Sequence, residues 1–117
     1  MPTIRDLVGA LRERQGVEAA IVLGRDGLVI DGQATGHVAA EDLAAHLPGI
    51  VSSADEFGRA AARGELTTAV LEYPTGLGIV SVLSADAILL VLVQPSANIG
   101  QLLFEIRRNR EHIAALV

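Results

Sequence analysis

The 117-residue chain contains no cysteine, no lysine and no tryptophan, and only one tyrosine and two phenylalanines. Without cysteine it has no disulfide framework, no thiolate nucleophile and no cysteine-based zinc site. The lack of lysine excludes a Walker-type phosphate loop, a kinase-type strand lysine and Schiff-base chemistry. With so few aromatic residues, the core must be packed with leucine, isoleucine, valine and alanine.

Charge and hydropathy narrow the class of protein further. The net charge is −5 and the nine cationic residues form no basic stripe, so we do not expect a nucleic-acid binder. Charges at Arg5, Asp6 and Arg12 argue against a signal peptide or membrane insertion, and we expect a cytoplasmic protein. The length predicts one domain over residues 1–117. A mean hydropathy of +0.44 is high for so small a domain, which indicates an oligomer.

Helical periodicity appears near the start of the chain and again in its middle. Thr3 and Asp6 form a capping-box pattern that begins a first amphipathic helix, and Gly16 ends it. A second, long helix is predicted over residues 39–63, with a kink or break caused by Pro48. Its apolar stripe is expected to consist of Leu43, Leu47, Ile50, Ala54, Phe57 and Ala61.

Five segments have the composition and period of β-strands. These predicted strands cover residues 17–23, 28–31, 66–73, 77–83 and 87–93. Asp26 and Gly27 predict a type I′ turn between the first two. After the last strand, Ser96 or Asn98 caps a final helix.

The residues that could carry chemistry fall into ordinary structural patterns. His37, His46 and His112 lack metal-ligand spacing, and Asp26 and Asp31 are explained by turn chemistry rather than by paired carboxylates. The serine pair at residues 52–53 has no nucleophile elbow, and the glycines at 76 and 78 follow a strand rather than precede a helix. We therefore predict no catalytic residue, no cofactor and no metal site.

Three segments together carry a resemblance to a known family. They are the first hairpin, AAIVLGRDGLVIDG over residues 19–32, the helix end Phe57-Gly58-Arg59, and the later turn EYPTG over residues 72–76. With the order of elements, they resemble the Roadblock family of dynein-light-chain-like domains and bacterial MglB-like regulators of Ras-like GTPases. The resemblance implies an α/β, Roadblock-like (profilin-like) sandwich of order α-β-β-α-β-β-β-α. Its five-stranded antiparallel sheet would carry the long second helix on one face and the terminal helices on the other.

The resemblance also implies a homodimer or heterodimer that pairs the third strands and packs the long helices together. The threonine-rich segment 66–73 suits such an edge strand, and small residues on the long helix would admit a second helix. A loop over the edge, or a plain alanine-rich surface, are the alternatives. The predicted dimer interface is Leu66, Thr67, Thr68, Ala69, Val70, Leu71, Tyr73, Ser53, Glu56 and Ala60.

A Ras-like small GTPase is the partner that the resemblance implies. For its binding we predict Arg25, Ala45, His46, Ser52 and Arg59. Arg25 at the first hairpin could act as an arginine finger, although arginine at a solvated turn is commoner.

The arginines of the final helix are expected to pair along the helix. The predicted ion pairs are Arg107 with Glu111 and Arg108 with Glu105, and the alternative is that these arginines and Arg110 form a docking patch for an acidic partner.

The sequence thus favours a non-enzymatic, dimeric regulatory or adaptor domain that binds a Ras-like GTPase and modulates its nucleotide cycle. One alternative is an assembly scaffold in a signalling complex, without effect on GTP turnover. Another is a small-molecule sensor of the profilin or PAS type, which would need an internal cavity.

Overall fold

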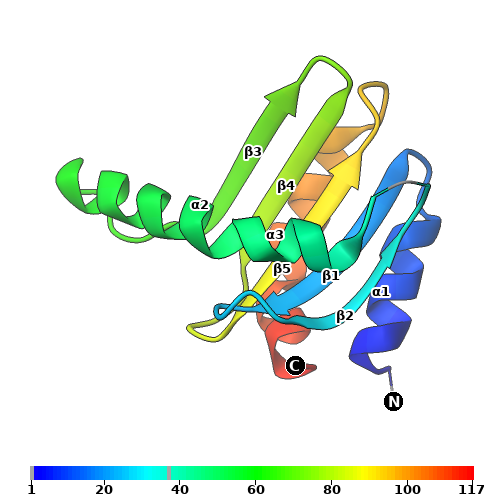
Figure 1. The fold of residues 1–117 in the computed structure, drawn as a ribbon, viewed down its shortest axis with the longest axis horizontal. Helices are drawn as coiled ribbons and strands as arrows, with labels where there is room; N and C mark the ends of the chain where they lie inside the picture. The colour runs from blue at the N-terminus through cyan, green and yellow to red at the C-terminus, as the bar shows by residue number, and fades with distance from the viewer. Residues whose placement is uncertain (1, 37) are drawn as a thin grey trace.

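The computed structural model describes residues 2–36 and 38–117 and contains the predicted succession of three helices and five strands (Figure 1). The strands form one antiparallel sheet in the order β2-β1-β5-β4-β3. The elements are α1 (Ile4–Glu13), β1 (Val17–Gly24), β2 (Val29–Ala34), α2 (Ala40–Ala60), β3 (Thr68–Tyr73), β4 (Gly76–Val82), β5 (Ala87–Val93) and α3 (Ile99–Ala115).

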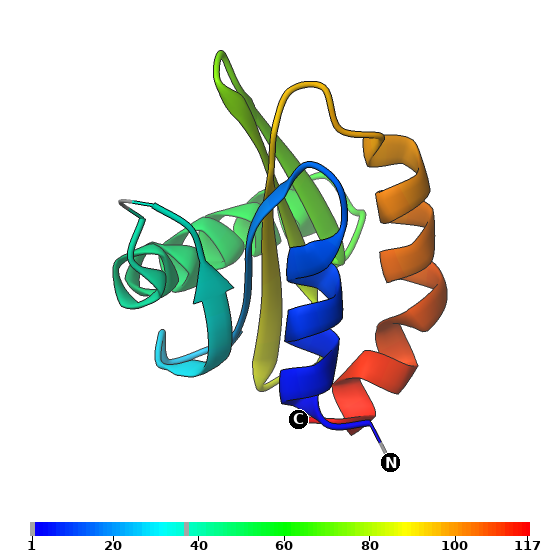
Figure 2. The same ribbon diagram turned by 90° about the vertical axis from the view of Figure 1, so that its right-hand side faces the viewer.

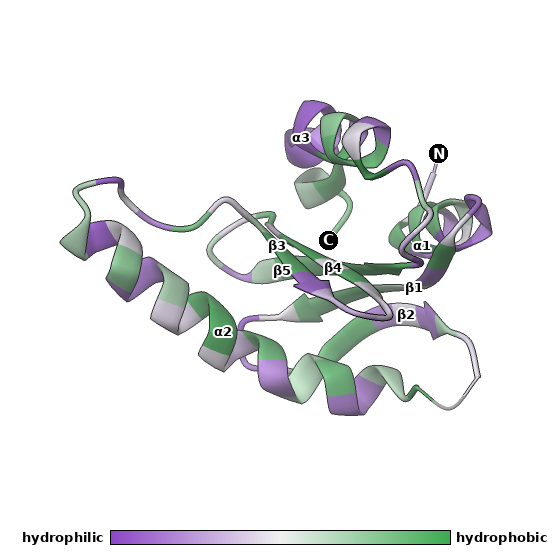
Figure 3. Cartoon of the chain, turned by 90° about the horizontal axis from the view of Figure 1, so that it is seen from above, coloured by the Kyte–Doolittle hydropathy of each residue, from purple (hydrophilic) through white to green (hydrophobic). Residues whose placement is uncertain are grey.

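Helices cover both faces of this sheet, as the resemblance implied. Figures 2 and 3 show α2 on one face and α1 with α3 on the other. On the α2 side, Leu47 and Val51 pack in a cluster with Ile21 and Ile88. The cluster on the opposite side contains Val8, Leu11, Val22, Leu89, Leu102 and Ile106. The central strands β1 and β5 are therefore apolar on both faces, and the core is aliphatic as predicted.

The predicted helix caps of α1 and α3 are confirmed. Asp6 N–H donates to Thr3 Oγ1 at 3.2 Å, and Thr3 N–H donates to the Asp6 carboxylate at 2.9 Å. At the start of α3, Asn98 rather than Ser96 is the cap, because its Oδ1 accepts from Gln101 N–H at 3.2 Å.

The turn between β1 and β2 is not the predicted type I′ turn. A type I′ turn needs two residues with positive φ, and of the two predicted residues only Gly27, at +88°, has one. Gly27 N–H donates to the Gly24 carbonyl at 3.0 Å, and Gly24 N–H donates to Leu28 at 2.9 Å. These bonds define a three-residue hairpin loop with a left-handed glycine. β2 then continues to Ala34, beyond the predicted end at residue 31.

The long helix is continuous through Pro48, so of the predicted kink or break the break is ruled out, and Figure 3 shows the axis bending near the middle. One proline removes only one helical hydrogen bond and bends the helix. The helix ends at Ala60, before the predicted residue 63, because the chain turns there: Ala62 has a φ of +57°.

Candidate protein interface

The C-terminal half of α2 extends past the edge of the sheet beyond β3 (Figures 1 and 3). The buried residues of α2 are Ala44, Leu47, Val51 and Asp55. The prediction that Phe57 and Ala61 belong to the core stripe is wrong, because Phe57 is 75% exposed and Ala61 is also exposed. The sheet ends before it reaches these residues, so this half of the helix lacks a surface to pack on.

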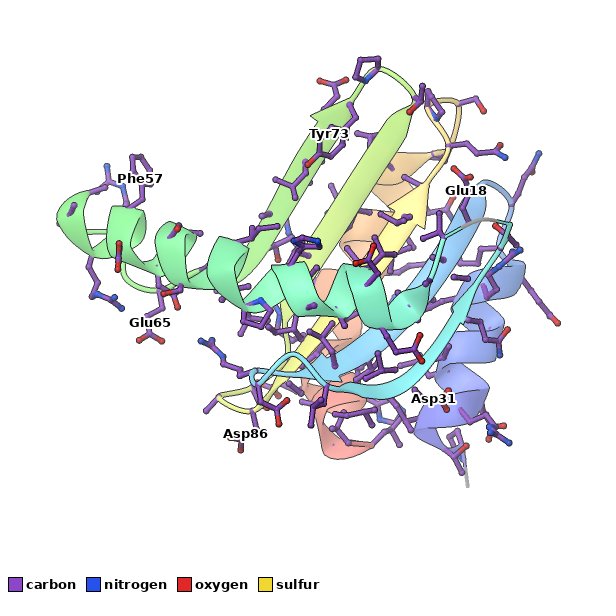
Figure 4. The ribbon with its side chains drawn as sticks, viewed as in Figure 1. Glu18, Asp31, Phe57, Glu65, Tyr73 and Asp86 are labelled. Atoms are coloured by element: carbon purple, nitrogen blue, oxygen red, sulfur yellow. The ribbon has the colours of Figure 1, made fainter. Side chains whose placement is uncertain are left out.

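A second apolar stripe therefore lies beside the buried one. Ile50, Ala54, Phe57 and Ala61 follow at intervals of four and three residues, which places them on one side of α2. Ile50 and Ala54 are half-buried, and the predicted interface residues Ser53 and Ala60 lie beside the stripe and are exposed. In Figure 4, Phe57 points to the side of α2 on which β3 and Tyr73 lie. Small residues around one large apolar side chain suit a second helix.

The flank of α2 opposite the apolar stripe, here termed its outer side, is polar and also exposed. Ala45, Ser52 and Arg59 follow at seven-residue spacing, which places them on one face of the helix. The predicted interface residue Glu56 is exposed on the same side. His46 is exposed and its Nε2 lies 3.9 Å from the Asp42 carboxylate. All the predicted residues of α2 are therefore accessible, on two different sides of the helix.

The predicted edge strand is an edge of the sheet, because β3 pairs only with β4. Its six residues pair with β4 in unbroken register, and Val70 and Tyr73 are 42% and 58% exposed. The other edge, β2, differs because its pairing with β1 shifts register between Val22 and Leu23. Irregular edges resist pairing with another chain, whereas regular ones invite it. Of the two edges, β3 is the one suited to pair.

The first residues of the predicted interface make contacts within the chain. Leu66 precedes β3, and its N–H donates to Asp55 Oδ1 at 2.7 Å. The Thr67 carbonyl accepts from Val82 N–H at 2.9 Å. Arg110 of α3 donates to Thr68 Oγ1 at 2.5 Å. The edge strand thus begins at residue 68 rather than at residue 66, and within it Ala69 and Leu71 pack against the α2-side core.

Arg25 is partly buried against α2 rather than fully solvated at the turn. Its Nη1 lies 3.5 Å from the Asp55 carboxylate, and its side chain is only 33% exposed. The residue is therefore not a solvated turn arginine, and it is already engaged with α2. Sequence reasoning missed Asp55, whose side chain is 8% exposed, because a carboxylate on a helix is usually solvated.

The arginines of α3 do not pair as predicted. Glu105 forms its ion pair with Arg14 of α1 rather than with Arg108. Arg110 reaches across to the sheet, where it contacts Ser81 as well as Thr68. Arg110 thus contributes to the fold, whereas Arg107 and Arg108 are exposed.

The described residues hold no group of three or more histidine, cysteine, aspartate or glutamate side chains arranged for a metal ion. His37, for which no metal-binding role was predicted, lies outside the described residues. Among residues 2–36 and 38–117, no helix has the length and apolar character needed to span a bilayer.

Comparisons with known proteins agree with this architecture. The chain is 29% identical to the uncharacterized protein MJ1340 of Methanocaldococcus jannaschii over 106 residues, which cover 91% of this chain and 92% of that protein. Among solved structures, a Roadblock/LC7 domain from Streptomyces avermitilis superposes with a TM-score of 0.84 at 24% identity, over 96% of this chain and 95% of that one. Myxococcus xanthus MglB gives 0.87 at 13% identity, over 97% and 93%.

The sequence profile of the Roadblock/LC7 domain matches residues 3–93, which include both elements of the exposed surface, α2 and β3. The order of the elements and the sheet topology match the solved Roadblock structures. The chain belongs to the Roadblock/LC7 family.

Proposed function

We infer that the protein is a non-enzymatic, dimeric regulatory domain that binds a Ras-like small GTPase in the cytoplasm. The observation that supports this most strongly is the apolar stripe of α2, which extends past the sheet to the exposed Phe57 and lies next to β3, a regular edge strand whose outer side is unpaired. A second copy of the chain would cover the apolar stripe and pair with the open edge of β3 at the same time. Its β3 would pair with this β3, and its α2 would cover Phe57.

The partner class rests on the family. Structural similarity to MglB and to Myxococcus xanthus MglC supports a Roadblock-type regulator, and the TM-score to MglC is 0.68. In the proposed dimer, the apolar side of α2 is used by the second copy. The polar outer side, with Ala45, Ser52 and Arg59, stays free for the GTPase. Arg25 contributes only at its exposed third, since its Nη1 is directed at the Asp55 carboxylate.

Light scattering after size-exclusion chromatography tests this proposal. The purified chain is run alone and with a Ras-like GTPase encoded near it, loaded with GDP or with a GTP analogue. A dimer that binds one nucleotide form supports the regulator. A dimer that binds both forms equally and leaves the GTP hydrolysis rate unchanged identifies a scaffold instead. A monomer at all concentrations contradicts the proposal.

A further inference from the structure

We propose that Asp55 is a positioning residue that holds the start of β3 against α2 and thereby sets the affinity of the dimer. This inference rests on the proposed dimer. Asp55 is a buried carboxylate and the last of the buried residues along α2. Buried charges are rare unless they are paired and hydrogen-bonded, so this one calls for a physical explanation.

The two oxygens of Asp55 hold two different parts of the chain. Oδ1 accepts from the backbone N–H of Leu66 at 2.7 Å, and Oδ2 lies 3.5 Å from Arg25 Nη1. Leu66 is two residues before β3 begins, and Arg25 belongs to the turn between β1 and β2. One side chain of α2 therefore fixes both the edge strand and the first hairpin relative to the helix.

The connection from α2 to β3 is folded back tightly onto the helix. Arg63 N–H donates to the Gly58 carbonyl at 2.7 Å, and Arg59 lies 3.7 Å from the Glu65 carboxylate. At Gly58 a Cβ atom would overlap the carbonyl oxygen of Gly64, so the close approach requires glycine there. The Asp55 bond to Leu66 closes this connection at its far end.

The consequence for association is geometric. The proposed dimer uses β3 and the extended half of α2 together, so the two elements must hold one fixed relative orientation before binding. A connection that is already ordered loses less conformational entropy when the second copy binds. Without the Asp55 acceptor, Leu66 N–H would lose its partner and the start of β3 would be free to move away from α2.

The test compares dimer dissociation constants, measured by analytical ultracentrifugation, with exchange of the Leu66 amide hydrogen. Asp55→Ala removes the acceptor, and we expect the Kd to rise about tenfold or more, together with faster Leu66 exchange. Asp55→Asn retains an oxygen for Leu66 N–H, so its Leu66 amide should stay protected and its Kd should stay within about threefold of the wild type.

Two controls separate positioning from simple loss of stability. Asp42→Ala removes an exposed carboxylate from the same helix and should leave the Kd unchanged. Val8→Ala cuts a cavity in the core on the opposite face and should lower the melting temperature without changing the Kd.

If Asp55 acts as proposed, the dimer Kd and the exchange rate of the Leu66 amide must change together. A folded Asp55→Ala chain in which either the Leu66 exchange rate or the dimer Kd stays at its wild-type value overturns the inference and leaves the dimer intact. If Asp55→Ala does not fold, Asp55→Ser takes its place, because the shorter side chain withdraws the acceptor from Leu66 N–H while it keeps a polar group at the position. A wild-type chain that is monomeric throughout instead overturns the dimer itself, and the positioning role with it.

Discussion

The backbone N–H of Val82 donates a hydrogen bond of 2.9 Å to the carbonyl of Thr67. In an antiparallel pair, the residues of a strand alternate between pointing their backbone groups toward the neighbour and away from it. Because the Thr67 carbonyl points toward β4, the backbone groups of Ala69 and Leu71 also point toward β4. The N–H of Val70 points outward. The outward groups are the ones that a second β3 would bind.

Replacing Val70 by proline tests this assignment. Val70→Pro removes an outward N–H, so the β3–β4 ladder should survive at a stability cost of about 1 kcal/mol. The dimer Kd should rise about tenfold or more, measured by analytical ultracentrifugation.

Ala69→Pro is the matched control. It removes an inward N–H and should destabilise the fold by about 3 kcal/mol in urea denaturation. Equal stability losses in the two variants would show that the alternation has been assigned wrongly.

Phe57 and Phe104 form a second matched pair, because both phenylalanines are exposed and the helices that carry them, α2 and α3, lie on opposite sides of the sheet. Phe57→Glu places a charge in the proposed helix contact and should raise the dimer Kd about a hundredfold, as for an interface residue at the centre of the contact. Phe104→Glu, on α3, should leave it unchanged. Neither change should lower the melting temperature of the monomer by more than a few degrees. An effect of Phe104→Glu alone would move the interface to α3.

The order of the elements could be predicted from the sequence, because local patterns determine it. The Thr3–Asp6 capping box is a short-range interaction, and the β5 bounds of Ala87–Val93 follow from a continuous apolar segment. The turn type could not be predicted from Asp26-Gly27 alone, since the same pair fits both two-residue and three-residue loops. Loop length depends on how β2 aligns with β1, and that is a tertiary property.

The surface was harder to predict than the fold. Apolar periodicity on α2 predicts that a stripe of side chains is covered, but it does not say whether the same chain or another one covers it. Phe57 therefore fits the core of its own chain as far as the sequence shows. Its exposure becomes visible only once the sheet is seen to end before it. Asp55 was missed for a related reason, since its partners Leu66 and Arg25 lie 11 and 30 residues away in sequence.

The pair formed by Arg25 and Asp55 predicts a stability effect for Arg25. Arg25→Gln leaves the buried carboxylate with Leu66 N–H as its remaining partner and should cost about 1–2 kcal/mol in urea denaturation, because Arg25 itself is partly solvated. Arg5→Gln is the control, since Arg5 is 84% exposed and its ion pair with Asp31 spans 3.8 Å. It should change stability by less than about 0.5 kcal/mol. If Arg25→Gln leaves stability intact and reduces only GTPase stimulation, the arginine is free to act as a finger.

The outer side of α2 provides the last prediction, which separates GTPase binding from dimerisation. Ser52→Arg adds a long, charged side chain to the exposed face that also carries Ala45 and Arg59. It should weaken binding of the GTPase about tenfold or more in calorimetry, while the chain remains dimeric by light scattering. Ala115→Arg makes the same kind of addition on α3, across the sheet, and should change neither. Because the apolar stripe and the outer side lie on different sides of one helix, a variant should be able to lose GTPase binding without losing dimerisation. A Ser52→Arg chain that dissociates into monomers would instead place the dimer contact on the outer face, and the GTPase would then need another surface.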